Sequence, residues 1–306
     1  IYNAFAQYAL TPKLNVQAEF RRRNSDHGDL LLDFNPSFFS RDRRQLDQDS
    51  ARGGIRYSLS SKQDFLISGI YFDRREKTAH PAELMKIADI PFDVLIPAFN
   101  NRLKDQGYQL EGQFLHRDKF MNLVTGAGAY DIDAKLRCNG DVCSSNAVNF
   151  ARERENAYFY SNLNYFQNIN ATLGVSYDAF RDAVNQNFDA VNPKFGLQWD
   201  LTPAVRLRLA WFESVKSALI ANQTLEPTQV AGFNQMFDDL NGTRSRRMGA
   251  GLDAALSKNI YGGVEVSDRD LKVPYLNGDF RQFASEQQQE RLYRSYLYWL
   301  PHAHWA

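Results

Sequence analysis

The sequence predicts an all-β protein, an antiparallel up-and-down transmembrane β-barrel, and three observations support this fold class. Segments of about ten residues alternate between apolar and polar side chains along the whole chain. Short turns and long polar connections follow these segments alternately, as they do in outer-membrane barrels. The segments also exceed the roughly five or six residues usual for strands of soluble proteins and match the length with which a tilted strand crosses a bilayer.

Residues 14–21 show the alternation most clearly. Leu14, Val16, Ala18 and Phe20 share one face of the expected strand, whereas the residues between them are polar. The same period recurs in residues 108–114, 194–200, 205–212 and 248–256. Each of these segments therefore has one apolar and one polar face.

The segments add up to about thirteen strands, with the start of another at Trp305 and Ala306. Closed single-chain bacterial barrels have an even number of strands. We therefore expect residues 1–306 to form a single barrel domain with about 13–14 strands present, incomplete at both ends and part of a larger barrel. A complete fourteen-stranded barrel is the alternative.

The polar faces favour a membrane barrel over a soluble β-sandwich, which also alternates. Unpaired charges buried in a dry core cost several kcal/mol each, so these side chains require water or opposite charges. A mean hydropathy of -0.50 with 13% aromatic residues agrees with an aqueous lumen inside an apolar, aromatic-rich outer surface. The candidate lumen and ligand-binding residues are Glu19, Arg21, Arg52, Arg56, Glu111, Arg206, Arg208, Arg247, Asp253, Glu265 and Arg294.

Composition excludes several other classes of protein. No run approaches the roughly 18 apolar residues of a membrane-spanning helix. The 36 basic and 36 acidic residues give a formal net charge of zero, so we expect no nucleic-acid partner. A hydrophobic content of 43% is too high for a disordered chain.

The two cysteines, Cys138 and Cys143, lie five residues apart in one polar segment. This spacing suits a small loop disulfide formed in an oxidising compartment. Two free thiols in a reducing compartment are the alternative.

Histidine and serine patterns give no support for catalysis. Ser25, Asp26 and His27 are adjacent on one extended segment, where they cannot converge as a triad. His302 and His304 have no carboxylate or cysteine beside them, and two cysteines alone do not make a structural zinc site. We therefore predict no catalytic residues, no metal site and no cofactor.

The long connection from residue 76 to residue 106 contains an apolar run at residues 90–99. A fully solvated loop has no reason to carry such a run. We expect it to fold over the mouth of the barrel or into the lumen, where it would either constrict a pore or pack on neighbouring loops.

Residues 222–235, followed by the strand pair 247–253 and 261–265, resemble part of the barrel of bacterial outer-membrane proteins similar to TonB-dependent receptors. Residues 192–203 are similar to strands that enter a short periplasmic turn in those receptors. The resemblance implies a barrel of 22 strands with a plugged lumen. It also implies a plug and a TonB box on the N-terminal side, and in some members tetratricopeptide repeats ahead of the barrel. Neither a plug nor a TonB box is recognisable in these 306 residues.

These observations predict an outer-membrane transport protein of a Gram-negative cell envelope and not an enzyme. We expect receptor-mediated or porin-like passage of a polar or anionic solute through a mixed-charge lumen gated by long extracellular loops. The expected partners are the lipid bilayer and lipopolysaccharide, whose phosphates suit arginine-rich strand ends, with TonB-type energy coupling through a plug outside this segment. The alternatives are an export pore for an exopolysaccharide and a surface adhesin or structural barrel.

Overall fold

The structure of the chain is a computed structural model that describes seven stretches of the sequence. They are residues 1–28, 41–85, 94–140, 147–182, 186–217, 223–276 and 283–301. Among these residues, no helix is long and apolar enough to cross a bilayer.

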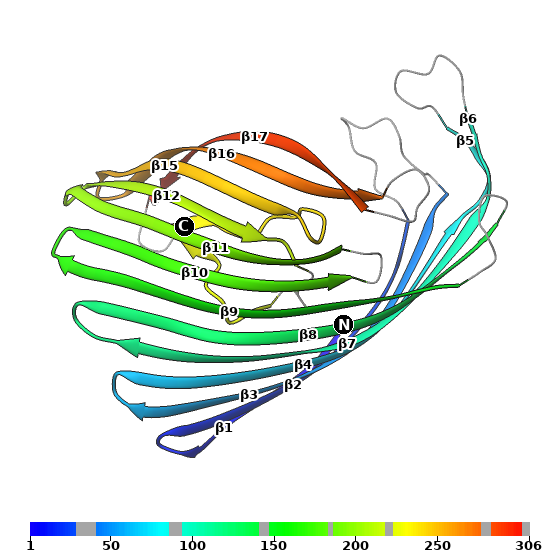
Figure 1. Ribbon diagram of the computed structural model, residues 1–306, viewed down its shortest axis with the longest axis horizontal. Helices are drawn as coiled ribbons and strands as arrows, with labels where there is room; N and C mark the ends of the chain where they lie inside the picture. Colours follow the sequence, from blue (N-terminus) through cyan, green and yellow to red (C-terminus); the bar gives the residue numbers. More distant parts are fainter. Residues whose placement is uncertain are drawn as a thin grey trace. The chain divides into compact units, whose positions relative to one another are not determined.

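Within the described residues, thirteen strands form one sheet in which each strand pairs with the neighbouring strands of the sheet along the chain (Figure 1). They are β1 (Tyr2–Thr11), β2 (Leu14–His27), β3 (Arg43–Ser60), β4 (Gln63–His80), β7 (Phe99–Arg117), β8 (Met121–Gly140), β9 (Val148–Phe166), β10 (Ile169–Asp182), β11 (Gln186–Thr202), β12 (Val205–Val215), β15 (Arg244–Ser257), β16 (Ile260–Leu276) and β17 (Phe283–Trp299). This meander confirms the predicted antiparallel all-β fold. Trp305 and Ala306, where another strand was expected, lie outside the described residues.

In the described residues, two further short hairpins are not part of the large sheet. One pairs β5 (Glu83–Met85) with β6 (Val94–Ile96), and the other pairs β13 (Gln229–Val230) with β14 (Phe233–Asn234). The first hairpin lies within the connection that was expected to fold over the mouth. Because residues 86–93 lie outside the described part of the chain, that expectation stays a prediction.

Most strands are longer than the roughly ten residues that the sequence pattern indicates, and the lengths range from 10 residues in β1 to 20 in β8. The apolar alternation marks only the part of a strand that meets an apolar environment. Backbone pairing continues past it, because a hairpin gains hydrogen bonds whether or not its side chains alternate. The predicted connection of residues 76–106 is correspondingly shorter, because β4 continues to His80 and β7 begins at Phe99.

Contacts divide the chain into two compact units that share several strands. The first unit comprises residues 1–55, 68–110 and 130–153, and the second comprises residues 56–67, 111–129 and 154–306. In the first unit, Arg74 donates to both carboxylate oxygens of Asp105 at 2.9 and 2.6 Å. Ile70 and Phe72 are buried in the same unit. The assignment of residues 1–306 to one barrel domain stays a prediction.

The second unit has two faces of opposite character. On β12, Arg208 is 8% exposed while its neighbour Leu209 is 39% exposed, and on β15, Arg247 is 1% exposed while Met248 is 52% exposed. We call the face that carries the buried arginines the inner face and the opposite one the outer face. Burial of charge with exposure of apolar side chains is the reverse of a water-soluble core. The soluble sandwich is therefore wrong for these strands.

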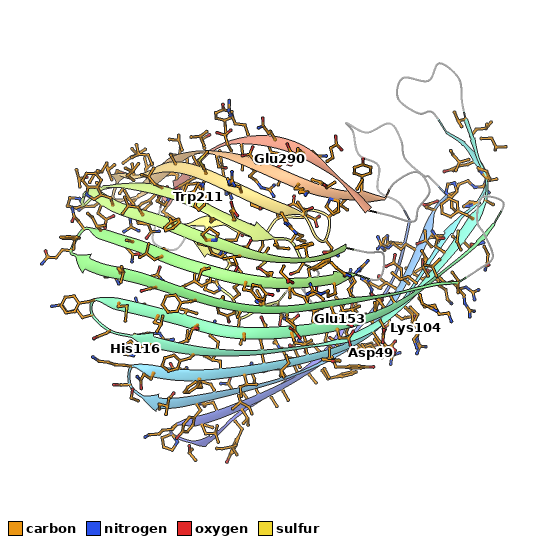
Figure 2. The ribbon with its side chains drawn as sticks, in the orientation of Figure 1. Asp49, Lys104, His116, Glu153, Trp211 and Glu290 are labelled. Carbon is orange, nitrogen blue, oxygen red and sulfur yellow. The ribbon has the colours of Figure 1, made fainter. Side chains whose placement is uncertain are left out.

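The outer face changes from apolar to charged along each strand. Phe195 and Trp211 are cross-strand partners with ring centroids 5.6 Å apart (Figure 2 labels Trp211). Two residues further along the same face, Glu213 accepts a hydrogen bond from Arg246 at 2.9 Å. An aromatic row at such a boundary is typical of the position where a barrel strand leaves the hydrocarbon layer.

Leu209 lies on the outer face of β12, between the rows marked by Trp199 and Trp211. Leu209→Arg would place a guanidinium against acyl chains, so we expect it to lower the free energy of unfolding by roughly 2–4 kcal/mol. Urea titration of the protein in lipid vesicles measures this change. Leu240→Arg, at an exposed site in a connection, is the matched control. Equal stability of the two variants would contradict the assignment of the outer face.

Candidate functional site on the inner face

A segment between β12 and β15 covers the inner face of the second unit. We call residues 223–243, which include β13 and β14, the inner segment. Val230 pairs with Phe233, and the two residues between them, Ala231 and Gly232, have φ values of 48° and 85°. Positive φ at both central positions is the requirement of a type I′ turn, which suits the twist of a two-residue hairpin. The hairpin tip is therefore a defined turn.

A row of small residues receives this hairpin. Thr172, Gly196, Ala210, Gly249 and Ser267 are successive cross-strand partners from β10 to β16. A Cβ atom on Gly196 would lie 2.9 Å from the Cβ of Ala231, and a Cβ on Gly249 would overlap the ring of Phe233. We call the inner face of β9 to β12, β15 and β16 the wall. The glycines are needed because the hairpin packs directly on the backbone of the wall.

Two side chains of the hairpin are completely buried. Val230 and Phe233 each have 0% exposure, and they join a hydrophobic cluster that includes Tyr158, Tyr160 and Phe212 from the wall. Fully burying a side chain of this size stabilises by roughly 1.5–3 kcal/mol. The hairpin is thus held in place by apolar packing as well as by polar contacts.

Glu226 is the centre of a buried polar cluster. It accepts a hydrogen bond from the Tyr160 hydroxyl at 3.0 Å and from Asn156 Nδ2 at 3.2 Å, and Arg154 lies 3.5 Å away. Arg154 also donates to Asp178, with Nε at 2.8 Å from Oδ1. Burial raises the pKa of the Glu226 carboxyl above its ordinary value, although the positive charges of Arg154 and Lys194 act in the opposite direction.

Further contacts hold the rest of the inner segment. Near its start, Glu111 accepts from Thr224 Oγ1 at 2.5 Å and from the backbone N–H of Leu225 at 3.1 Å. Near its end, Arg269 pairs with Asp239 and stacks over the ring of Phe237, with 3.7 Å from Cζ to the ring centroid. These contacts come from strands on both sides of the hairpin.

A second polar cluster surrounds Glu265 on β16. Its carboxylate lies 3.4 Å from Arg208, 3.3 Å from Arg247 and 2.9 Å from Arg294. Arg208 also pairs with Asp253 at 2.6 Å. Arg247 then links this cluster to the inner segment by donating to the backbone carbonyl of Asn234 at 2.9 Å.

The structure brings together some of the predicted lumen residues and separates others. Arg208, Arg247, Asp253, Glu265 and Arg294 form the second cluster, and Glu111 holds the inner segment. The remaining candidates lie in other pairs or on the surface: Arg206 pairs with Asp200 at 2.6 Å, Arg56 with Asp64 at 3.1 Å and Arg52 with Glu19 at 2.6 Å, and Arg21 is exposed on β2. Their common role in lining a lumen stays a prediction.

Sequence reasoning missed the cluster around Glu226. Arg154 lies on the polar face of an alternating strand, so the alternation that identified the other candidates would have included it. Glu226 lies in a connection in which apolar and polar residues do not alternate. A different feature of the sequence could have identified it, because Glu226 is the one charged residue between Lys216 and Asp238.

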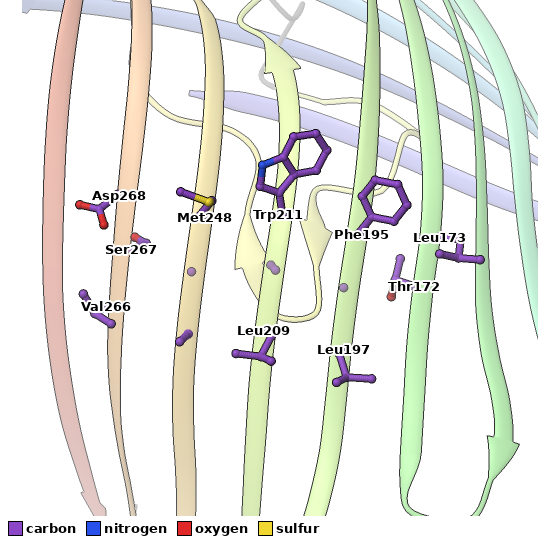
Figure 3. Close-up of a pocket in the computed structure, with 14 residues that line it drawn as sticks. Thr172, Leu173, Phe195, Leu197, Leu209, Trp211, Met248, Val266, Ser267 and Asp268 are labelled. Atoms are coloured by element: carbon purple, nitrogen blue, oxygen red, sulfur yellow. The ribbon is translucent and has the colours of Figure 1, made fainter.

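The cavities agree with a tightly packed inner segment. The space among Arg154, Asp178, Lys194 and Glu226 measures about 30 Å³, which holds about one or two water molecules. A larger hollow of about 520 Å³ is lined by Phe195, Leu209, Trp211 and Met248 among others. Figure 3 shows these side chains on the strands of the wall. They belong to the outer face, so this hollow is not on the side of the inner segment.

Two predicted features fall partly outside the described residues. Cys138 is disulfide-bonded, but its predicted partner Cys143 lies outside them, so the pairing stays a prediction. His302 and His304 also lie outside them.

Residues 2–286 match the family described as TonB dependent receptor-like, beta-barrel. The chain belongs to this family. Membership confirms the predicted β-barrel and its location in the bacterial outer membrane. Because the TonB-dependent receptor family consists of transporters, it also agrees with the prediction that the protein is not an enzyme. No curated protein shows a significant match to the sequence.

Solved receptors share the fold of this TonB-dependent receptor-like barrel. The ferric preacinetobactin receptor BauA of Acinetobacter baumannii matches 99% of the chain with a TM-score of 0.70 and 10% identity, over 52% of its own length. The ferripyoverdine receptor of Pseudomonas aeruginosa matches 97% with a TM-score of 0.68 and 11% identity, over 46% of its length. The alcaligin receptor FauA of Bordetella pertussis matches 96% with a TM-score of 0.59 and 12% identity, over 48% of its length. The chain therefore spans about half the length of these receptors.

The fit between Gly249 and Phe233 predicts the effect of one added methyl group. Gly249→Ala should displace the hairpin and lower the free energy of unfolding by about 1–3 kcal/mol, because an overpacked contact forces the wall or the hairpin to shift. A cysteine at buried Val230 should then react faster with a maleimide than it does in the parent protein. Gly112→Ala, where an added Cβ meets nothing within 4 Å, is the matched control. Similar labelling rates in both variants would show that the glycine is not needed for the hairpin.

The raised pKa of Glu226 predicts a pH dependence. The native carboxyl keeps its proton at pH values at which the unfolded one has lost it, so its contribution to stability declines as pH rises above the ordinary carboxyl pKa of 4.5. Glu226→Gln keeps an acceptor for Tyr160 and removes this titration. Unfolding free energies measured from pH 4 to 8 should fall for the parent relative to the variant. Parallel curves would contradict the prediction.

Proposed function

We propose that this TonB-dependent receptor-like barrel passes a polar solute across the outer membrane and that the inner segment closes the path until it moves. The observation that carries the proposal is the packing of the inner segment against the wall, with Glu226, Val230 and Phe233 buried. A structural barrel has no need for a long connection packed on its inner face. A transporter does, because a large lumen must be closed when no solute is present.

The charges of the wall support a polar solute rather than a strongly anionic one. Arg208 and Arg247 are already paired with Asp253 and Glu265. The exposed pairs of the second unit, such as Arg206 with Asp200, also contain both signs. A solute that passes such a wall meets donors and acceptors in similar numbers, and this arrangement fits hydroxyl, amide or zwitterionic groups.

The strength of the packing implies that movement of the inner segment needs a driving force. Val230 and Phe233 together contribute roughly 3–6 kcal/mol. Spontaneous release would then occupy less than about one molecule in a hundred. Solute binding or TonB-type coupling through a plug would supply the difference, and the family relationship supports coupling of this kind. The receptors for ferric preacinetobactin and ferripyoverdine are the structural precedents for the fold.

A removable cross-link tests whether the inner segment closes the path. In Gly196→Cys/Ala231→Cys the Cβ atoms start about 2.9 Å apart, and a shift of less than about 1 Å reaches disulfide geometry. A second variant shortens the inner segment by replacing residues 226–237 with a short glycine linker. The full-length proteins are compared by conductance in planar bilayers. We expect the shortened variant to conduct several times more than the parent, and the oxidised cross-linked variant to conduct no more than the parent.

The controls separate the cross-link from other effects of oxidation. Each single cysteine variant, and the parent with and without reductant, should behave alike, while reductant should restore the conductance of the double variant to that of the parent. A shortened variant that is folded but conducts like the parent would refute the role of the inner segment.

A further inference from the structure

A histidine and two carboxylates from separate parts of the chain come together in the first unit. Asp42 directly precedes β3, His80 is the last residue of β4 and Glu83 is the first residue of β5. One potential ligand atom of each lies within 4.8 Å of the other two. No other group of three such side chains with this spacing is found in the part of the chain that the structure describes.

The hairpin of β3 and β4 explains why these residues meet. Each strand has 18 residues, and only Ser61 and Lys62 separate them. Two strands of equal length that leave a tight turn end at the same level, so the start of β3 and the end of β4 are neighbours. Glu83 follows His80 by three residues, with Pro81 and Ala82 between them.

His80 is held in one orientation. Its side chain has no exposed surface, and its Nδ1 atom contacts Oδ1 of Asp42. Its ring stacks on Phe99 with a centroid separation of 4.7 Å. The Asp42 side chain remains 19% exposed, so the group borders solvent on one side.

We propose that Asp42, His80 and Glu83 bind a divalent transition-metal ion, with zinc as the best fit. Calcium and magnesium prefer oxygen ligands alone, whereas an imidazole nitrogen with carboxylate oxygens suits zinc and its neighbours in the first transition row. A divalent ion would also offset the repulsion between two nearby carboxylates. A water molecule would complete a four-coordinate site.

The two arginines that follow Asp42 in the sequence lie near acids outside the group. Arg43 lies 4.0 Å from Asp26, and Arg44 pairs with Glu76 at 2.8 Å. Their charges are therefore directed to carboxylates outside the group.

The ion would connect two long connections of the barrel. Asp42 ends the connection that precedes β3, and Glu83 begins the hairpin that follows β4. Both lie at the end of the strands opposite the two-residue turns, which is the extracellular side in outer-membrane barrels. The metal would be taken from the medium and would hold these connections together. The inference is independent of the role proposed for the inner segment.

Zinc titration of the full-length protein tests the site. The protein, purified in detergent without a histidine tag and freed of metal with EDTA, is titrated with zinc chloride by calorimetry. We expect one zinc ion per chain at this site and at least tenfold weaker binding by His80→Gln and by Glu83→Gln. His116→Gln, at the short-turn end of β7 (Figure 2), is the matched control and should bind like the parent.

A spectroscopic measurement on the unaltered protein covers the case in which a variant does not fold. X-ray absorption at the zinc edge of the one-to-one complex should show one imidazole nitrogen with oxygen ligands, and not oxygen alone or several imidazoles. Absence of saturable zinc binding up to millimolar concentration would overturn the proposal. Unchanged binding by folded His80→Gln and Glu83→Gln would overturn it as well.

Discussion

Pairing of charges on the inner face is the constraint on which the second unit depends. Its strands expose apolar side chains on the outer face, so their polar side chains are forced inward, where many of them lose contact with water. Arg247 and Lys194 are each 1% exposed. Buried charges of this kind are tolerated only when opposite charges and hydrogen bonds surround them. The clusters around Glu226 and Glu265 meet that condition, and they fix the inner segment as a consequence.

The inner segment fits the wall through two kinds of contact, apolar packing and polar clusters. Small residues on five successive strands leave a shallow bed for the hairpin, and polar clusters on both sides of the bed bind the rest of the segment. Arg247 belongs to the wall and also binds the inner segment, since it contacts Glu265 and the backbone of Asn234. Movement of the inner segment would therefore disturb the charge pairs of the wall. This coupling links the position of the inner segment to the electrostatics of the strands.

Much of the fold could be predicted from the sequence because alternation is a local property of each strand. The same period identified Arg208, Asp253 and Glu265, which face one another because they lie on the polar face of neighbouring strands. Other features depend on contacts between distant residues. Glu226 lies in a connection without a period, and the meeting of Asp42 with His80 follows only from the equal lengths of β3 and β4. The strand ends were also missed, because backbone pairing between strands continues beyond the residues that alternate.

The backbone conformation at position 231 favours glycine, but alanine is found there. The extended backbone at position 196 accepts any side chain, but glycine is found there. The turn at position 231 has a positive φ, where glycine is the residue of least strain, while position 196 is ordinary extended strand. The methyl group of one fills the gap left by the missing side chain of the other. The two positions thus share a single volume, so related chains with a similar inner segment should change them together and keep their combined size constant.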